Sequence, residues 1–157
     1  MQVLIMRHGE AMLNAASDAL RALTANGRET SRHMAQWLNQ QNVQIDHILV
    51  SPYLRARQTL EAMREALTLT LNEEVLPELT PNGEAEWVSD YLQRLQQQGV
   101  RCVLLVSHLP LVGYLVAELC PAEAPPMFAP AEIAAVELPT EGYGRLLWQL
   151  NPAKLPR

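Results

Sequence analysis

Three short apolar runs constrain the fold of this chain more than any other feature. They cover residues 3–6, 48–50 and 103–106, and each is rich in leucine or β-branched residues without a clean polar alternation. Such runs are typical of strands that are buried on both faces of a parallel sheet. Segments with helical spacing of apolar residues separate them, and strands that alternate with helices indicate an α/β layered fold.

The remaining elements follow from the same patterns. Thr24 is a candidate N-cap for a helix that runs to residue 41, because its short side chain can accept a hydrogen bond from the first helical turn. Further helices are expected over residues 54–67, 83–98 and 111–119, a proline-rich loop over 121–130, and two final strands over 131–138 and 145–150. We therefore expect one domain over residues 1–157, a three-layer α/β/α sandwich with a mostly parallel central sheet.

Composition excludes several classes of protein. The formal net charge of −5 gives no general attraction to nucleic acid or to an anionic membrane. No apolar stretch reaches the length of a membrane span, and the first residues lack the pattern of a secretory signal, so a cytoplasmic location is expected. Cys102 and Cys120 lie in or at the end of apolar runs and are expected to be buried thiols. A monomer is the favoured state.

Polar residues with catalytic potential follow each of the three apolar runs. Arg7 and His8 follow the first run, the segment that leads to Arg55 follows the second, and His108 follows the third. Ligands of open α/β sheets bind outside the carboxyl ends of the strands, so these side chains should meet in one crevice. The other two histidines, His33 and His47, lie within a helical pattern and before a strand, and we expect them to be structural.

The residue types at these three positions suit phosphoryl chemistry. Two arginines can hold a dianionic phosphoryl group through their planar donors. A neutral imidazole among them can attack phosphorus and form a phosphohistidine intermediate, and nearby cations favour its neutral form. The cations also stabilise the oxygens of the transferred group. His108 can be protonated and bind the same oxygens, and neither a metal ion nor another cofactor is expected.

Other phosphatase chemistries lack their motifs. A cysteine nucleophile would need an arginine six residues later, where this chain has His108 after Cys102 and Pro126 after Cys120. The three aspartates are too far apart for an Asp-x-Asp motif, and no glycine-rich Walker loop is present. Short-spaced clusters of His and Asp that could bind a metal are also missing.

Four motifs in order resemble the histidine phosphatase superfamily, which has the phosphoglycerate-mutase-like fold. The motifs are Arg7-His8-Gly9-Glu10, Leu23-Thr24-x-x-Gly27, Ser51-Pro52-x-x-Arg55-Ala56-x-Gln58-Thr59 and Ser107-His108. The resemblance covers nearly the whole chain. It implies that His8 is the phosphorylated nucleophile and that Arg7, Arg55 and His108 hold the phosphoryl group.

Further segments are similar to the phosphohistidine phosphatases of this superfamily. They are Asp18-x-x-Arg21-x-Leu23-Thr24, Leu76-Pro77-Glu78-Leu79-Thr80-Pro81 and Ser107-His108-Leu109-Pro110-Leu111-Val112-Gly113-Tyr114. This similarity implies removal of phosphate from a phosphorylated histidine on a phosphotransfer protein of the HPt type. Residues 55–108 are fully used by two helices and a brief extended segment, so we expect an open, shallow site without a helical lid subdomain.

The functions of four further residues are left open by the sequence. Glu78 resembles the proton donor of relatives, although the following glycine comes one residue later than in the mutases, and a solvated loop carboxylate fits equally well. Arg21 extends the anion site or lies on the surface at a helix entry. Asn14 has a spacing that mutases use for substrate contact. Glu10 is expected to support the site from outside it or to lie on the surface.

Two other functions remain possible at this point. One is a small-molecule phosphatase or mutase of the same superfamily, which should have a cover over the site and more groups for a second phosphate or carboxylate. The other is a module that binds phosphohistidine without hydrolysing it, although binding alone needs no nucleophile such as His8.

Overall fold

Six strands form one sheet in the computed structural model, which describes residues 1–70 and 72–155. The strand order is β3-β2-β4-β1-β5-β6. The strands are β1 (Gln2–Arg7), β2 (His47–Val50), β3 (Glu73–Val75), β4 (Cys102–Ser107), β5 (Ile133–Glu137) and β6 (Arg145–Leu150). β1 to β4 run parallel, whereas β5 and β6 pair antiparallel. The mostly parallel sheet predicted from the sequence is confirmed.

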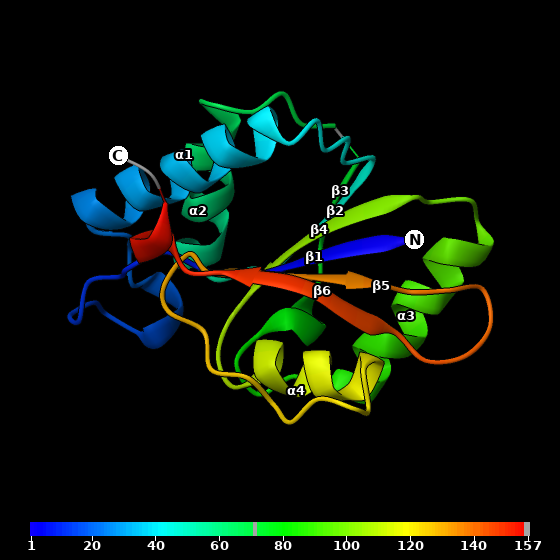
Figure 1. Ribbon diagram of the computed structural model, residues 1–157. Helices are drawn as coiled ribbons and strands as arrows, with labels where there is room; N and C mark the ends of the chain where they lie inside the picture. The colour runs from blue at the N-terminus through cyan, green and yellow to red at the C-terminus, as the bar shows by residue number, and fades with distance from the viewer. Residues whose placement is uncertain (71, 156–157) are drawn as a thin grey trace.

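Helices cover both faces of this sheet (Figure 1). They are α1 (Ala25–Gln40), α2 (Leu54–Arg64), α3 (Ala85–Gln97) and α4 (Leu111–Leu119), with the short 3₁₀ helices η1 (Asp18–Leu20), η2 (Pro77–Leu79) and η3 (Pro152–Lys154). One apolar core lies between the sheet and α1 and α2, and a second lies between the sheet and α3 and α4. The three-layer α/β/α arrangement is therefore confirmed.

The central strands owe their position to burial on both faces. Residues 3–6 of β1 and all six residues of β4 are buried, and successive side chains alternate between the two cores.

At the start of α1, the side chain of Thr24 accepts a hydrogen bond from the Gly27 N–H at 2.9 Å. A cap of this kind stabilises a helix by about 1 kcal/mol, and the predicted N-cap is confirmed.

Two helices are shorter than the sequence pattern predicts. α2 ends at Arg64 instead of residue 67, although Leu67 is still buried in the core. The Arg64 guanidinium contacts the Thr70 carbonyl at 3.3 Å and Glu73 at 2.9 Å, so it connects the end of α2 to the segment that enters β3. α3 begins at Ala85, two residues later than expected. The brief extended segment predicted between these helices is β3.

Among the described residues, the segment between α2 and α3 contains no helical subdomain that could cover the site. Between α2 and α3, the described residues form only β3 and η2 as regular elements. The fold without a helical lid is therefore as the sequence predicts. The described chain contains no helix that is both long and apolar enough to span a membrane.

Candidate active site

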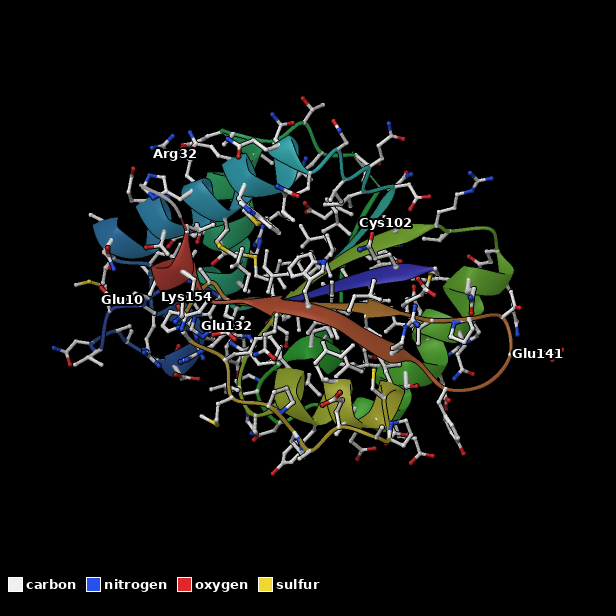
Figure 2. The ribbon with its side chains drawn as sticks, in the orientation of Figure 1. Glu10, Arg32, Cys102, Glu132, Glu141 and Lys154 are labelled. Carbon is white, nitrogen blue, oxygen red and sulfur yellow. The ribbon has the colours of Figure 1, made fainter. Side chains whose placement is uncertain are left out.

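The carboxyl ends of three parallel strands bring the predicted site residues together. Arg7 pairs with Ser107 across β1 and β4, and Val50 pairs with Val106 across β2 and β4. Because paired residues lie next to each other in neighbouring strands, the residues that follow them lie side by side at the carboxyl end of the sheet. Figure 2 shows Glu10 and Glu132 at this end of the molecule, whereas Cys102, at the start of β4, lies toward the other end.

Two motif glycines allow the chain after β1 to pack directly against α1. A Cβ atom on Gly9 would lie 2.7 Å from the Gly27 carbonyl oxygen, and a Cβ on Gly27 would lie 2.2 Å from the Glu10 carbonyl oxygen. Neither position can accept a side chain without movement of the backbone. The Gly9 N–H donates to the Thr59 hydroxyl at 3.0 Å, which also connects this segment to α2. The backbone beside His8 is thus fixed from two helices.

The hydrogen bonds of His8 define its reactive nitrogen. Nδ1 lies 2.7 Å from the Gly9 carbonyl oxygen, which can only accept, so Nδ1 carries the proton. The lone pair therefore lies on Nε2, where the Arg55 Nε–H donates to it at 3.2 Å. Burial first, and then the charges of Arg55 and Arg7, lower the pKa of His8 to about 4. A neutral imidazole with its lone pair on Nε2 is the form needed for nucleophilic attack.

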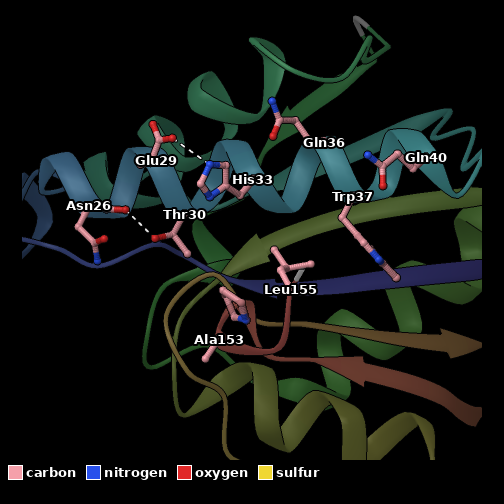
Figure 3. Close-up of a pocket in the computed structure, with 10 residues that line it drawn as sticks. Asn26, Glu29, Thr30, His33, Gln36, Trp37, Gln40, Ala153 and Leu155 are labelled. Atoms are coloured by element: carbon pink, nitrogen blue, oxygen red, sulfur yellow. Dashed lines mark hydrogen bonds and ion pairs between the residues drawn. The ribbon is translucent and has the colours of Figure 1, made fainter. Parts of the chain in front are cut away.

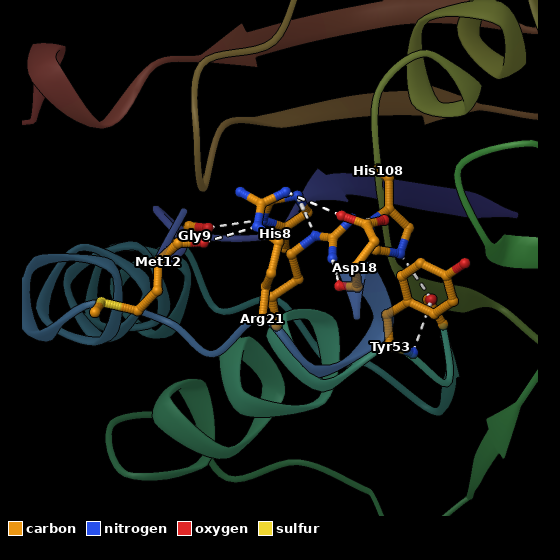
Figure 4. A network of polar contacts seen from close by, with 9 residues as sticks. His8, Gly9, Met12, Asp18, Arg21, Tyr53 and His108 are labelled. Carbon is orange, nitrogen blue, oxygen red and sulfur yellow. Dashed lines mark hydrogen bonds and ion pairs between the residues drawn. The ribbon is translucent and has the colours of Figure 1, made fainter. Parts of the chain in front are cut away.

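Arg55 is buried and connects His8 to the loop that follows β1. Its guanidinium donates to the Asp18 carbonyl oxygen at 2.7 Å and to the Asp18 carboxylate at 3.2 Å. Arg21 donates to the other carboxylate oxygen of Asp18 at 3.1 Å. Hydrogen bonds from Arg21 and then Arg55 hold the pKa of Asp18 below its usual value. Figure 4 shows Asp18 and Arg21 next to His8.

Arg7 is held from the opposite side of the site. One terminal nitrogen donates to the Phe128 carbonyl oxygen at 2.8 Å. Glu132, which is buried, accepts from the Ala129 N–H at 2.9 Å and also contacts the amide of Gln149, so it fixes the loop that presents this carbonyl. Burial and the neighbouring charge of Arg55 lower the pKa of Arg7. Its guanidinium is thereby oriented before any ligand binds.

His108 completes the group at the end of β4. Its ring centroid lies 5.1 Å from that of His8 and 5.2 Å from that of Tyr53, and its Nε2 lies 2.7 Å from the Ser51 hydroxyl oxygen. Burial lowers the pKa of His108 to about 3, with smaller effects from His8 and Arg55. With this pKa, the His108 ring is neutral at pH 7 in the protein by itself, so the protonated form that could bind phosphoryl oxygens is not its resting form.

Two residues of this group, Arg7 and His108, each carry a buried polar atom without a hydrogen-bond partner. Among the described residues, the unpaired buried side-chain atoms are Arg7 Nε, His108 Nδ1 and Glu78 Oε2. An unpaired buried polar group costs about 1–3 kcal/mol, and in native proteins such groups are rare and call for a reason. From the sequence, Arg7 and His108 are expected to hold the phosphoryl group, whereas Glu78 is a candidate proton donor or a solvated loop carboxylate. Arg7 Nε carries a hydrogen and is therefore a free donor.

Hydrogen bonds connect some of the remaining candidate residues to this group and leave others outside it. Arg21 joins it through Asp18 and also donates from Nε to the Met12 carbonyl oxygen at 2.7 Å. Asn14 is exposed in the loop between β1 and η1, and no hydrogen bond connects it to the group within the described chain. Glu10 accepts from the Thr24 hydroxyl at 2.8 Å and is exposed, which matches the expected surface position.

Asp18, Ser51 and Phe128 contribute contacts that were not assigned from the sequence. Asp18 could have been found by its position three residues before Arg21, a spacing that favours an ion pair across one turn. Ser51 had a signal in its motif, since it is the first residue after β2. Phe128 contributes a backbone carbonyl, for which the sequence has no signature.

The histidines outside the group are paired elsewhere, as expected. His33 lies 2.9 Å from Glu29 on the exposed face of α1, and His47 lies 2.5 Å from Glu74 at the start of β2. His33 and Glu29 also line a surface groove of about 740 Å³ between α1 and the segment around η3 (Figure 3). None of the residues that line this groove belongs to the candidate site. The described residues include no cluster of three or more His, Cys, Asp or Glu that could hold a metal ion.

The two buried histidines predict a pH-dependent stability. Unfolded histidine has a pKa of 6.5, whereas the folded values are about 4 for His8 and about 3 for His108. From pH 6.5 down to about 4, the unfolded chain binds more protons, so the free energy of unfolding falls as the pH falls. Each histidine contributes a slope of up to about 1.4 kcal/mol per pH unit. Urea unfolding between pH 4.5 and 7 should show a flatter slope for the His8→Asn/His108→Asn double variant, and parallel slopes would contradict this.

The comparisons with known proteins agree with this geometry. The model of the histidine phosphatase superfamily (branch 1) matches residues 3–86. The phosphohistidine phosphatase SixA of Escherichia coli K12 is 58% identical over 155 residues, which cover 99% of this chain and 96% of the relative. The SixA homolog of Haemophilus influenzae Rd is 42% identical over 162 residues, covering 99% of this chain and 93% of the relative.

A solved structure agrees equally well. The protein histidine phosphatase SixA complexed with tungstate superposes with a TM-score of 0.97 at 58% identity, covering 99% of this chain and 100% of that one. The similarity extends over the three strand ends and all four motifs. The chain therefore belongs to the histidine phosphatase superfamily.

Proposed function

We propose that this protein is a phosphohistidine phosphatase that removes the phosphoryl group from a histidine of an HPt-type phosphotransfer protein. The observation that carries the proposal is the pair of unpaired buried atoms on Arg7 and His108, of which the His108 ring lies 5.1 Å from the ring of a neutral His8. The similarity to proteins named phosphohistidine phosphatase SixA supports the substrate class. We place the activity in the cytoplasm, because Cys102 and Cys120 are both free thiols, as is usual in reducing compartments.

The first half of the proposed reaction transfers the phosphoryl group to the protein. The lone pair on His8 Nε2 attacks phosphorus, and the bond between phosphorus and the substrate nitrogen breaks. The electron pair of that bond remains on the substrate imidazole, which leaves neutral if its other nitrogen was protonated beforehand. Arg7, Arg55 and His108 hold the phosphoryl oxygens during transfer. The Nε–H of Arg55, which contacts His8 Nε2 at 3.2 Å, is close enough to turn to an oxygen of the incoming group.

The second half restores the free protein. A water molecule attacks the phosphorus atom on His8, the bond between phosphorus and Nε2 breaks, and inorganic phosphate leaves. The proton stays on Nδ1 throughout, hydrogen-bonded to the Gly9 carbonyl oxygen, so the same tautomer of His8 is regenerated. The phosphorylated ring is held by a backbone contact that the reaction does not need to break, which favours repeated turnover.

Exposed apolar side chains beside the site support a protein substrate. Met12, Leu13 and Leu20 are exposed in or next to the loop that carries Asp18, and Met127 is exposed beside Phe128. These four residues, here called the apolar rim, neighbour the contacts that hold Arg21, Arg55 and Arg7. Apolar residues gathered at a binding site are typical of a surface that meets another protein. A small phosphate ester would gain little from them.

The proposed function is tested by comparing three substrates. A phosphorylated HPt-type protein, 3-phosphoglycerate and an aryl phosphate should be incubated separately with the protein, and release of inorganic phosphate measured. The proposal predicts the highest kcat/KM with the phosphoprotein. A preference for 3-phosphoglycerate would favour a small-molecule phosphatase or mutase. Binding of the phosphoprotein without release of phosphate would instead indicate a binding module.

A charge placed on the apolar rim should selectively lower the activity toward the protein substrate. We expect Leu13→Asp to lower kcat/KM for the phosphoprotein by roughly 10-fold, since desolvating a carboxylate at an interface is unfavourable. Turnover of the aryl phosphate should stay unchanged. Tyr143→Asp is a matched control, because Tyr143 is 80% exposed and Leu13 is 86% exposed, but Tyr143 lies in the turn between β5 and β6. Equal losses on both substrates would rule out a docking function for Leu13.

The proposed acid function of Glu78 should depend on the substrate. An alkoxide or phenoxide leaving group needs a proton, whereas the imidazole of a phosphohistidine can be protonated on its ring before transfer. We therefore expect Glu78→Gln to impair aryl phosphate hydrolysis by roughly 10²-fold and phosphohistidine hydrolysis much less. Glu84→Gln, just before α3, is the control. If Glu78→Gln reduced both activities equally, Glu78 would not be acting as a selective proton donor.

A further inference from the structure

Ser51 is fully buried at the end of β2 and has two polar neighbours among the described residues. The Tyr53 N–H donates to its hydroxyl oxygen at 3.2 Å. His108 Nε2 lies 2.7 Å from the same oxygen. Figure 4 shows Tyr53 beside His108, where these contacts meet. The motif that contains Ser51 thus contacts the second histidine of the site as well as supplying Arg55.

Counting hydrogens decides which atom donates in the contact between Ser51 and His108. The Tyr53 N–H can only donate, so the hydroxyl oxygen of Ser51 accepts there. If His108 Nε2 also donated to this oxygen, the hydroxyl hydrogen of Ser51 would be buried without an acceptor. Leaving such a donor unpaired costs about 1–3 kcal/mol. The first arrangement would leave two groups unpaired, the Ser51 O–H and the lone pair on His108 Nδ1. The reverse arrangement, in which the Ser51 O–H donates to the lone pair of His108 Nε2, leaves only the Nδ1–H unpaired and is therefore favoured.

This arrangement determines where His108 carries its proton. In a neutral imidazole one nitrogen donates and the other accepts, and the partner of one nitrogen sets the state of the other. With Nε2 accepting from Ser51, the proton of His108 lies on Nδ1. Nδ1 is buried and unpaired, and the His108 ring lies 5.1 Å from the ring of His8. A free N–H donor is therefore available beside the nucleophile.

We infer that Ser51 is a positioning residue that fixes His108 as the Nδ1–H tautomer, whose N–H donates to an oxygen of the phosphoryl group on its way to or from His8. The inference rests on the proposed function. The opposite tautomer would turn a lone pair toward an anionic oxygen, which is repulsive. Ser51 thus acts through His108, and it lets a neutral histidine stabilise the transferred group.

The position of the proton can be measured without any activity. Long-range ¹H–¹⁵N spectra of the ¹⁵N-labelled protein distinguish a protonated ring nitrogen from an unprotonated one. We expect His108 at pH 7 to show a protonated Nδ1 and an unprotonated Nε2. Addition of inorganic phosphate should shift the Nδ1 signal, because the N–H gains an acceptor. An Nε2–H tautomer in the unmodified protein would overturn the inference, whatever substrate the protein hydrolyses.

The kinetic test removes the hydroxyl group. Ser51→Ala should populate the Nε2–H tautomer and lower kcat for the phosphoprotein on the order of 10-fold, the size seen when the outer partner of a functional histidine is lost. Ser51→Thr, which keeps the hydroxyl group, should restore the tautomer and most of kcat. Ser31→Ala is the control, because it removes another fully buried serine hydroxyl, one that donates to the Gly27 carbonyl oxygen at 2.7 Å.

The outcomes separate this inference from the proposed function. An unchanged tautomer and an unchanged kcat in Ser51→Ala would overturn the inference while leaving the phosphatase proposal intact. A protein without phosphohistidine phosphatase activity would refute the proposed function, yet its spectra with and without inorganic phosphate would still decide the tautomer. A Ser51→Ala variant that loses kcat but keeps the Nδ1–H tautomer would also contradict the inference.

Discussion

His8→Ala is expected to abolish phosphate release from a phosphohistidine protein, with a loss in kcat of at least roughly 10³-fold. The reason is that Nε2 of His8 carries the only lone pair placed for attack among the histidines of the described site, since the proton lies on Nδ1 against the Gly9 carbonyl oxygen. Alanine cannot form the covalent intermediate. The measurement is single-turnover release of phosphate, compared with the unmodified protein.

Loss of folding would imitate loss of the nucleophile, so two controls are needed. Binding of the phosphoprotein should survive in His8→Ala, because Arg7, Arg55 and His108 still present their donors. His33→Ala should retain full turnover, since His33 is exposed on α1 and pairs with Glu29. Phosphate release by His8→Ala at the rate of the unmodified protein would reject His8 as the nucleophile.

Arg55→Lys is expected to lower kcat/KM by roughly 10²-fold or more, although it preserves the charge. The Arg55 guanidinium donates to His8 Nε2 with one nitrogen and to Asp18 with the other two. A lysine ammonium is a compact point charge and cannot make these contacts together. Because Arg55 is 4% exposed, water cannot replace the lost contacts. Steady-state kinetics with the phosphoprotein measures the effect.

The same helix offers the control for this substitution. Arg57 is exposed on α2, two residues from Arg55, and Arg57→Lys should leave kcat/KM within twofold of the unmodified protein. Equal kcat/KM for Arg55→Lys and Arg57→Lys would mean that a single positive charge near the site is sufficient. The planar donor arrangement assigned to Arg55 would then be wrong.

The parts of the fold that the sequence predicts well are those with strong burial. β1, β2 and β4 have consecutive apolar residues because both of their faces are covered, and α1 has an N-cap that satisfies a specific N–H. β3 is harder to locate, because it is an edge strand of sequence Glu-Glu-Val with little burial. Its pairing with β2 stabilises it, and that pairing has no local signature in the sequence.

The candidate site also has residues that the sequence predicts and contacts that it does not. His8, Arg7, Arg55 and His108 are predictable because each follows the end of a buried strand, and the topology brings those ends together. The contact of Arg55 with Asp18 spans 37 residues, and that of Arg7 with the Phe128 carbonyl spans 121, so neither follows from local spacing. The protonation state of His108 does not follow from the sequence, because the sequence does not show how deeply a ring is buried, and burial lowers the pKa of His108 to about 3.

Trapping of the covalent intermediate tests the central claim most directly. The protein should be mixed with a ³²P-labelled phosphohistidine protein, quenched within milliseconds at alkaline pH, and digested for mass spectrometry, with ³¹P NMR of the quenched protein in parallel. A phosphoryl group on Nε2 of His8, formed and lost at rates that account for kcat, is the predicted result. Turnover without any phosphorylated His8, or a phosphoryl group on another residue, would contradict the account.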